Sequence, residues 1–215
     1  EYFAALCTHR PVVICLEDLH WADEESLEIL SDLLQEPHPW RLCVVSLARP
    51  SFVERKIPWG KSAAGVPLPH HQLINLLPLN QNSASALAHE LLQRVPRPPE
   101  WMVELLTERG GGNPYFMEEL VHWLIEQDVI LTSPDQWLVT VSKPVGLSIP
   151  GTIQGVLQAR LEHLSPTLRS ALQRAAVIGR VFWDEAVAYI GEEPVEPGLW
   201  ETLLKNDFIR AIPNS

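Results

Sequence analysis

Two adjacent carboxylates, Glu17 and Asp18, are the residues of this sequence best placed to do chemistry. They directly follow the apolar run at residues 12–16, which predicts a buried β-strand. At the C-terminal end of a parallel strand, where open α/β sheets bind ligands, one carboxylate could hold Mg²⁺ on the phosphates of a nucleotide while its neighbour polarises a water. A solvated acidic strand end explains the two residues equally well when they are considered alone.

The residues around this pair predict the elements that would position it. Asp23 is typical of a helix N-cap, and leucines at helical spacing predict a helix that continues to about Glu36. Residues 41–47 form a second apolar run. The order strand, helix, strand predicts a βαβ unit with a right-handed crossover. The apolar character of both runs predicts strands that are buried on both faces of a parallel sheet.

The rest of the chain changes from loop to helical character. Residues 51–72 are rich in Pro, Gly and His and predict a long loop, whereas 73–79 predict an edge strand because Pro78 cannot donate to a ladder. Three short helices after Ser165 and an extended segment at 208–212 are typical of a winged helix that is cut off in its wing. Between these parts, the pattern predicts helices over 83–95, 100–109, 114–127 and 152–163, and a β-hairpin over 129–132 and 137–141.

Composition and charge limit the possible classes of protein. The 215 residues carry a formal net charge of −11 and are 46% hydrophobic, which is globular composition and argues against a broad nucleic-acid or anionic-lipid surface. No apolar run approaches the ~20 residues that a bilayer span needs, so we expect no membrane partner. The three cysteines, Cys7, Cys15 and Cys43, fit no metal site. The apolar runs around Cys15 and Cys43 predict buried reduced thiols in a cytoplasmic protein.

Several segments of the chain resemble one protein family, in the same order along the sequence. The family is that of the STAND-type signalling ATPases, which are related to AAA proteins and occur in LuxR-type and in cyclase- or kinase-fused regulators. The segments are 16–23 (LEDLHWAD, similar to the Walker B segment), 47–50 (LARP, similar to the end of the sensor 1 strand), 112–120 (GNPYFMEEL, similar to part of the helical lid) and 149–153, 159–164, 175–180 and Phe182 (similar to the stretch from lid to winged helix).

This resemblance implies a fold and a domain order. The expected fold is the C-terminal half of an α/β P-loop NTPase core with a parallel sheet, followed by an α-helical lid and a winged-helix domain. The expected boundaries are 1–80 for the core, 81–164 for the lid with its β-hairpin, and 165–215 for the truncated winged helix.

The resemblance also implies roles for three residues of the core. Glu17 is expected to coordinate Mg²⁺ directly or through water, and Asp18 is expected to orient or activate the water that attacks ATP. The family often has Asp at the first position, which leaves open which of the two acids touches the metal. Arg49 is expected to sense the γ-phosphate, a bidentate task that suits a guanidinium.

In the lid, the resemblance places Gly112, Asn113 and Pro114 in a nucleotide-binding segment. Gly112 is expected to allow close approach to the adenine, and Pro114 to form a flat apolar contact. The alternative is an ordinary turn between helices with proline at the first helical position. The acidic residues Glu118, Glu119 and Glu126 are expected to form a solvated helix face, and Trp101, Trp123, Trp183 and Trp200 are expected at helical core positions.

These expectations combine into a hypothesis about function. The chain begins at Glu1 without Met or a signal peptide, and we expect it to be the middle of a cytoplasmic multidomain regulator. Binding and slow Mg²⁺-dependent hydrolysis of ATP to ADP would switch the lid and winged helix between two arrangements. The expected partners are output and sensor domains outside the chain, with self-association on activation. A Walker A loop is missing, so we expect this chain alone to bind ATP poorly.

The alternative hypothesis is a non-catalytic module with a vestigial nucleotide site, which serves as a scaffold or as a DNA-binding part of a transcription regulator. A recognition helix needs side chains that reach base edges, such as Arg, Lys, Asn or Gln. The last expected helix, residues 198–206, carries Glu201 and Lys205 and little else that is charged. We therefore expect no direct nucleic-acid contact from this chain.

Overall fold

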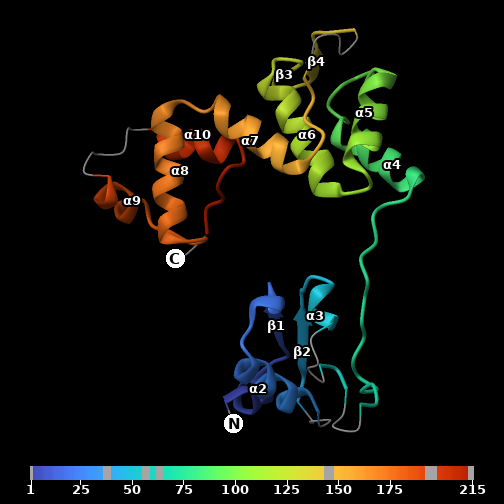
Figure 1. Ribbon diagram of the computed structural model, residues 1–215, viewed down its shortest axis with the longest axis vertical. Helices are drawn as coiled ribbons and strands as arrows, with labels where there is room; N and C mark the ends of the chain where they lie inside the picture. The colour runs from blue at the N-terminus through green and yellow to red at the C-terminus, as the bar shows by residue number, and fades with distance from the viewer. Residues whose placement is uncertain are drawn as a thin grey trace. The chain divides into compact units, whose positions relative to one another are not determined.

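The computed structural model of the chain describes residues 2–35, 40–54, 59–61, 65–142, 148–191 and 198–212 (Figure 1). The chain divides into two compact units, unit 1 (Glu1–Leu76) and unit 2 (Leu77–Ser215). The elements of unit 1 are α1 (Tyr2–His9), β1 (Val12–Leu16), the 3-10 helix η1 (Leu19–Trp21), α2 (Glu24–Gln35), β2 (Leu42–Ser46) and α3 (Ser51–Glu54). Those of unit 2 are α4 (Gln81–Leu91), α5 (Glu100–Gly110), α6 (Pro114–Glu126), β3 (Ile130–Thr132), β4 (Trp137–Val139), α7 (Ile153–His163), α8 (Pro166–Ile178), α9 (Asp184–Ile190) and α10 (Leu199–Lys205).

Unit 1 is built on a parallel pair of strands. The register of β1 and β2 runs from Val12 opposite Leu42 to Leu16 opposite Ser46. The predicted order of strand, helix and strand is confirmed, with α2 between the two strands in the chain. A small apolar cluster forms beside the pair, where Leu27 of α2 is buried and Leu16 at the end of β1 packs against the cluster.

The other face of this strand pair is exposed, so the prediction of strands buried on both faces is wrong. Val13 is 63% exposed and Val45 is 45% exposed. Cys15 and Cys43 lie on the same face and are also exposed, which contradicts their predicted burial, whereas Cys7 is buried. Side chains alternate between the faces of a strand. Because the apolar cluster covers one face in the described part of unit 1, every second side chain of each apolar run meets solvent.

The segment at 73–79 forms no strand among the described residues, which contradicts the predicted edge strand. Its apolar side chains are largely exposed, with Leu76 at 87% and Leu77 at 80%. Pro78 has no N–H to donate. The segment is held at its end, where the Leu79 N–H donates to the Gly112 carbonyl oxygen over 2.8 Å. A strand needs a neighbouring edge along its length, and apolar character alone does not supply one.

The first part of unit 2 is a helical body with its own core. Helices α4 to α7 and the antiparallel hairpin of β3 and β4 lie together in Figure 1 and confirm the predicted helices and hairpin to within a few residues at their ends. Asn80 begins α4 by accepting the Ser83 N–H, and Thr152 begins α7 by accepting the Gly155 N–H. The buried core residues, which we call core A, are Ala84, Ala88, Leu92, Val95, Met102, Leu105, Leu106, Phe116, Met117, Leu120, Val121, Trp123, Leu124, Val129, Ile130 and Val156.

The second part of unit 2 has a separate, smaller core. Helices α8 and α10 bury the residues that we call core B, which are Leu164, Ala171, Leu199 and Leu203. Residues 208–212 form no strand, so the predicted extended strand is wrong, and the winged-helix assignment stays a prediction. Trp183, expected in a core, is 61% exposed because it precedes α9 and lies outside both clusters.

Candidate functional site

The acidic pair lies where the sequence predicted it, directly after β1. Both Glu17 and Asp18 are exposed. Asp18 has φ 54° and ψ 35°, which is the left-handed region, and it precedes η1. Among residues other than glycine, Asp and Asn adopt this conformation most readily. The extended backbone of β1 therefore ends before Asp18, where the chain turns into η1.

Hydrogen bonds join the loop after β1 to the loop after β2. The Leu47 N–H donates to the Leu16 carbonyl oxygen over 2.8 Å, and the Leu19 N–H donates to the Leu47 carbonyl oxygen over 3.0 Å. The Arg49 N–H donates to Nδ1 of His20 over 3.4 Å. The structure therefore brings the acidic pair and Arg49 into adjacent, connected loops at the C-terminal ends of neighbouring parallel strands.

The start of α2 stabilises this loop from the other side. Oδ1 of Asp23 accepts the Ser26 N–H over 2.7 Å, and Oδ2 accepts the Ser26 hydroxyl over 2.9 Å. These hydrogen bonds to the Ser26 backbone and hydroxyl lower the pKa of Asp23 below its ordinary value of 3.8. The predicted N-cap is confirmed, and the side chain of Asp23 is engaged in holding the helix.

The donor set at this edge fits Mg²⁺ in the way that nucleotide-binding proteins use it. Mg²⁺ is usually held by one or two carboxylates together with water and substrate phosphates. Glu17 and Asp18 supply two exposed carboxylates. In the described part of the chain, no group of three or more His, Cys, Asp and Glu side chains could hold a metal ion. Mg²⁺ requires octahedral coordination, so two carboxylates could hold it only together with further ligands such as water or phosphate oxygens.

Gly112, Asn113 and Pro114, which the resemblance predicted to bind nucleotide, lie in unit 2 and have a local structural explanation. Oδ1 of Asn113 accepts the Tyr115 N–H over 3.1 Å and the Phe116 N–H over 3.4 Å, and Pro114 is the first residue of α6. Gly112 has φ +74°, and a Cβ atom there would lie 2.5 Å from the Leu79 carbonyl oxygen. The turn between α5 and α6 thus requires Gly112 and Asn113 whether or not a nucleotide binds.

Sequence reasoning missed a buried ionic cluster in unit 2. Glu119 was expected on a solvated face, but it is 6% exposed, and Arg160 of α7 is 2% exposed. The Arg160 guanidinium donates from Nη1 to Glu119 and from Nε to Oε1 of Glu126 over 2.8 Å. The solvated-face expectation is therefore wrong for Glu119, and Glu126 is half-buried. The sequence signal that could have revealed this cluster is the spacing of seven residues between Glu119 and Glu126, which places both acids on one side of a helix.

The charge state of Arg160 follows from these contacts. Burial by itself lowers the pKa of Arg160, but the hydrogen bonds and negative charges of Glu126 and Glu119 outweigh burial and raise the pKa above its ordinary value. The two carboxylates therefore favour the charged form of the guanidinium.

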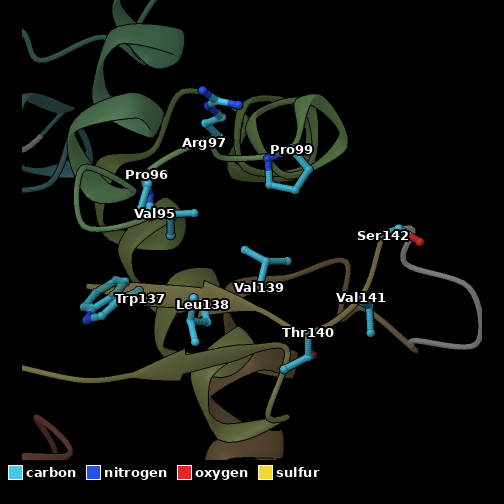
Figure 2. A pocket seen from close by; sticks show the side chains of 10 residues that line it. All are labelled: Val95, Pro96, Arg97, Pro99, Trp137, Leu138, Val139, Thr140, Val141 and Ser142. Carbon is cyan, nitrogen blue, oxygen red and sulfur yellow. The ribbon is translucent and has the colours of Figure 1, made fainter. Parts of the chain in front are cut away.

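A shallow hollow of about 580 Å³ lies elsewhere in unit 2 and contains none of the predicted site residues. Figure 2 shows the segment from Val95 to Pro99 on one side of it and the β4 residues Leu138 and Val139 on the other. The Trp137 N–H donates to the Arg94 carbonyl oxygen over 2.7 Å, which joins the two sides at one end. The hollow belongs to unit 2, and neither Glu17 nor Asp18 lines it.

Comparisons with known proteins give little guidance. No protein-family model and no solved structure matches the chain. Over 182 residues, 81% of the chain, the sequence is 29% identical to "Uncharacterized protein R02095" of Rhizobium meliloti (strain 1021). The chain spans 16% of the length of that relative. Among the described residues, no helix has the length and apolar character to cross a bilayer.

Proposed function

We propose that the chain belongs to a nucleotide-dependent signalling switch that binds ATP with Mg²⁺ and hydrolyses it slowly. In this proposal unit 1 supplies the C-terminal half of a P-loop NTPase core, and unit 2 supplies a helical lid and a winged helix. The whole regulator would include output and sensor domains and would self-associate on activation. The resemblance of residues 16–23, 47–50 and 112–120 to the STAND-type ATPases supports the assignment.

The observation that carries the proposal is the junction of the two strand ends in unit 1. Glu17 and Asp18 follow β1, and Arg49 follows the neighbouring parallel strand β2. Ligands of open α/β sheets bind at this edge. Two carboxylates and a guanidinium in connected loops provide the charges that a magnesium-bound phosphate requires.

Each residue has a distinct task in the proposed reaction. Mg²⁺, when bound, would neutralise charge that develops on the phosphates. Glu17 would hold that ion through its carboxylate. Asp18, which follows Glu17 in a left-handed backbone conformation, would accept a hydrogen bond from the attacking water and orient it. Arg49 would hold two oxygens of the γ-phosphate. The contact of Gly112, Asn113 and Pro114 with the adenine stays a prediction of the resemblance.

The test is ATP turnover by a form of the protein that carries the upstream phosphate-binding loop required by the proposal. We expect Asp18→Asn to lower turnover on the order of 100-fold, since it removes the group that orients the water. Asp32→Asn is the matched control, because Asp32 is an exposed carboxylate on α2. We expect the control to retain wild-type turnover.

A second substitution separates the two acids. Glu17→Gln is expected to raise the Mg²⁺ concentration needed for half-maximal turnover, whereas Asp18→Asn lowers turnover at saturating Mg²⁺. Unchanged turnover in both variants, with circular dichroism showing intact folds, would favour the alternative of a non-catalytic scaffold or DNA-binding module. Absence of G-x-x-x-x-G-K-[ST] from the upstream coding sequence would also favour the alternative of a non-catalytic module.

A further inference from the structure

The two cores of unit 2 meet at a polar joint. Core A and core B have no buried residue in common. Helix α7 leads from one to the other, since Val156 belongs to core A and Leu164, just after the helix, belongs to core B. Beside this covalent connection, the contacts between the two bodies include Arg160 and the segment that follows α10.

Arg160 makes four contacts from a buried position. On the side of core A it donates to Glu119 and to Glu126 of α6. On the side of core B, Nη2 donates to the Asn206 carbonyl oxygen over 2.7 Å. The guanidinium carbon lies 4.7 Å from the centre of the Phe208 ring, and Phe208 packs against core B. A planar guanidinium with donors in a fixed fork can hold these partners together, which an ammonium cannot do.

The segment held by Arg160 is the C-terminal end of α10. The Asp207 N–H donates to the Leu204 carbonyl oxygen over 3.1 Å, and the Phe208 N–H donates to the Leu203 carbonyl oxygen over 3.0 Å. Asp207 has φ 54°, in the left-handed region, which Asp adopts more readily than most residues other than glycine. Nε2 of His122 on α6 lies 3.7 Å from Oδ2 of Asp207. This helix end is thus held by polar contacts from two helices, from α6 through His122 and from α7 through Arg160.

The other end of the same cluster reaches the surface at the start of α6. Tyr115 is half exposed and follows Pro114. Burial, and then the negative charge of Glu119 one helical turn away, raise the pKa of Tyr115 above its ordinary value of 10.0. Tyr115 and Glu119 are four residues apart on α6, so their side chains lie on the same side of the helix, and Glu119 also accepts from Arg160. A contact at the beginning of α6 has a physical path to the end of α10 through Glu119 and Arg160.

We propose that Arg160 is the central residue of a releasable joint, which couples contacts at the N-terminal end of α6 to the docking of residues 206–208 at the end of α10. Arg160 is a positioning residue in this joint. The two states are the end of α10 bound to α6 and the same segment released. The proposal rests on the proposed function only for the nature of a ligand at the start of α6. The joint itself is tested without nucleotide, so the proposal of the joint can fail while the proposed function stands, and the reverse.

Hydrogen exchange of the Asp207 and Phe208 amides in the full chain tests the joint. Glu119→Gln removes the charge that holds Arg160 while keeping the shape of the side chain. We expect it to speed exchange of these two amides by roughly tenfold, the size of one hydrogen bond to a charged group. Glu118→Gln is the matched control, because Glu118 is the exposed neighbour on α6. We expect it to leave both amides within about twofold of wild type.

Tyr115→Phe tests whether the start of α6 is coupled to the end of α10 or whether Arg160 only supports that helix end locally. The substitution leaves the buried ion pairs of Arg160 in place. We expect this surface change to speed exchange of the Asp207 and Phe208 amides at least about twofold through Glu119, while amides of core A, such as that of Leu124, stay unchanged. If Arg160→Lys speeds exchange at the end of α10 but Tyr115→Phe does not, Arg160 only pins the helix end and the coupling is overturned. Unchanged exchange of the Asp207 and Phe208 amides in Glu119→Gln, Tyr115→Phe and Arg160→Lys would overturn the joint itself.

Discussion

Unit 1 and unit 2 form similar local elements but support them very differently. In the described part of unit 1 the sheet and α2 share a small cluster with Leu19, Leu27 and Phe52 buried, and one face of the sheet is exposed. In unit 2, helices α4 to α7 share the extensive core A. Because stability grows with the apolar area removed from water, unit 2 has the stronger support. We expect unit 1 to unfold first, and to depend more on its loops, caps and any bound ligand.

The largest effect should come from cutting into the two cores at matched positions. Leu106 of α5 and Leu27 of α2 are both fully buried. We expect Leu106→Ala to lower the free energy of unfolding of unit 2 by about 2–5 kcal/mol, with Leu27→Ala near the lower end of that range for unit 1, because a small cluster collapses more easily around a cavity. Urea unfolding, monitored by hydrogen exchange of amides in each unit, measures the free energy of unfolding of both units. Loss of protection in both units from either substitution would show that the comparison is wrong and that they unfold together.

The turn before α6 allows a second test, in which two neighbouring glycines separate backbone strain from packing. Gly111 has φ +55° with nothing near its missing Cβ, whereas at Gly112 a Cβ would meet the Leu79 backbone. We expect Gly111→Ala to cost unit 2 about 1 kcal/mol through strain, and Gly112→Ala to cost about 2–4 kcal/mol because overpacking adds to the strain. Thermal unfolding measures the difference. Equal costs would mean that the contact with Leu79 is not important for unit 2.

A third test compares left-handed aspartates in the two units. Asp18 in unit 1 and Asp128 after α6 in unit 2 have φ 54° and φ 55°. Replacement by glycine relieves the strain, so we expect Asp18→Gly and Asp128→Gly each to raise the free energy of unfolding by up to about 1 kcal/mol. Only Asp18→Gly should also lower ATP turnover in the longer protein, on the order of 100-fold as for Asp18→Asn. Retained turnover in Asp18→Gly would remove the proposed role of this carboxylate, whatever happened to stability.

The smallest effect concerns the two helix caps, Asp23 in unit 1 and Asn113 in unit 2. The folded pKa of Asp23 is lowered below 3.8, so its ionised form stabilises α2 above that pH, and the contribution is lost as pH falls through the folded value. As the pH falls from about 5 to about 2, protonation of Asp23 should slightly reduce the hydrogen-exchange protection of the amides at the start of α2. The amides at the start of α6 should show no such loss from their cap, because Asn113 does not titrate. Asp23→Asn should remove the dependence due to this cap.

Local patterns predicted most of the elements, because these elements arise from signals within a few residues. Asp23 and Asn113 cap their helices as short polar residues do, and the apolar runs of β1 and β2 pair in parallel as expected. The candidate site was predictable for the same reason, since Glu17 and Asp18 directly follow β1 and Arg49 lies three residues after the end of β2. The segment at 73–79 was misjudged, because a strand depends on a partner that no local pattern specifies.

The sequence by itself determined most of the helices and strands to within a few residues, which residues follow the two parallel strands, and the cap at Asp23. Only the tertiary structure decided which apolar and charged residues are buried. Val13, Cys15 and Val45 are exposed although their runs are apolar, and Glu119 and Arg160 are buried although they are charged. The physical reason is that propensity and capping act between near neighbours in the chain, whereas burial depends on which distant element packs against a given face. A charge can be buried only where such packing also delivers its partner, as α7 delivers Arg160 to α6.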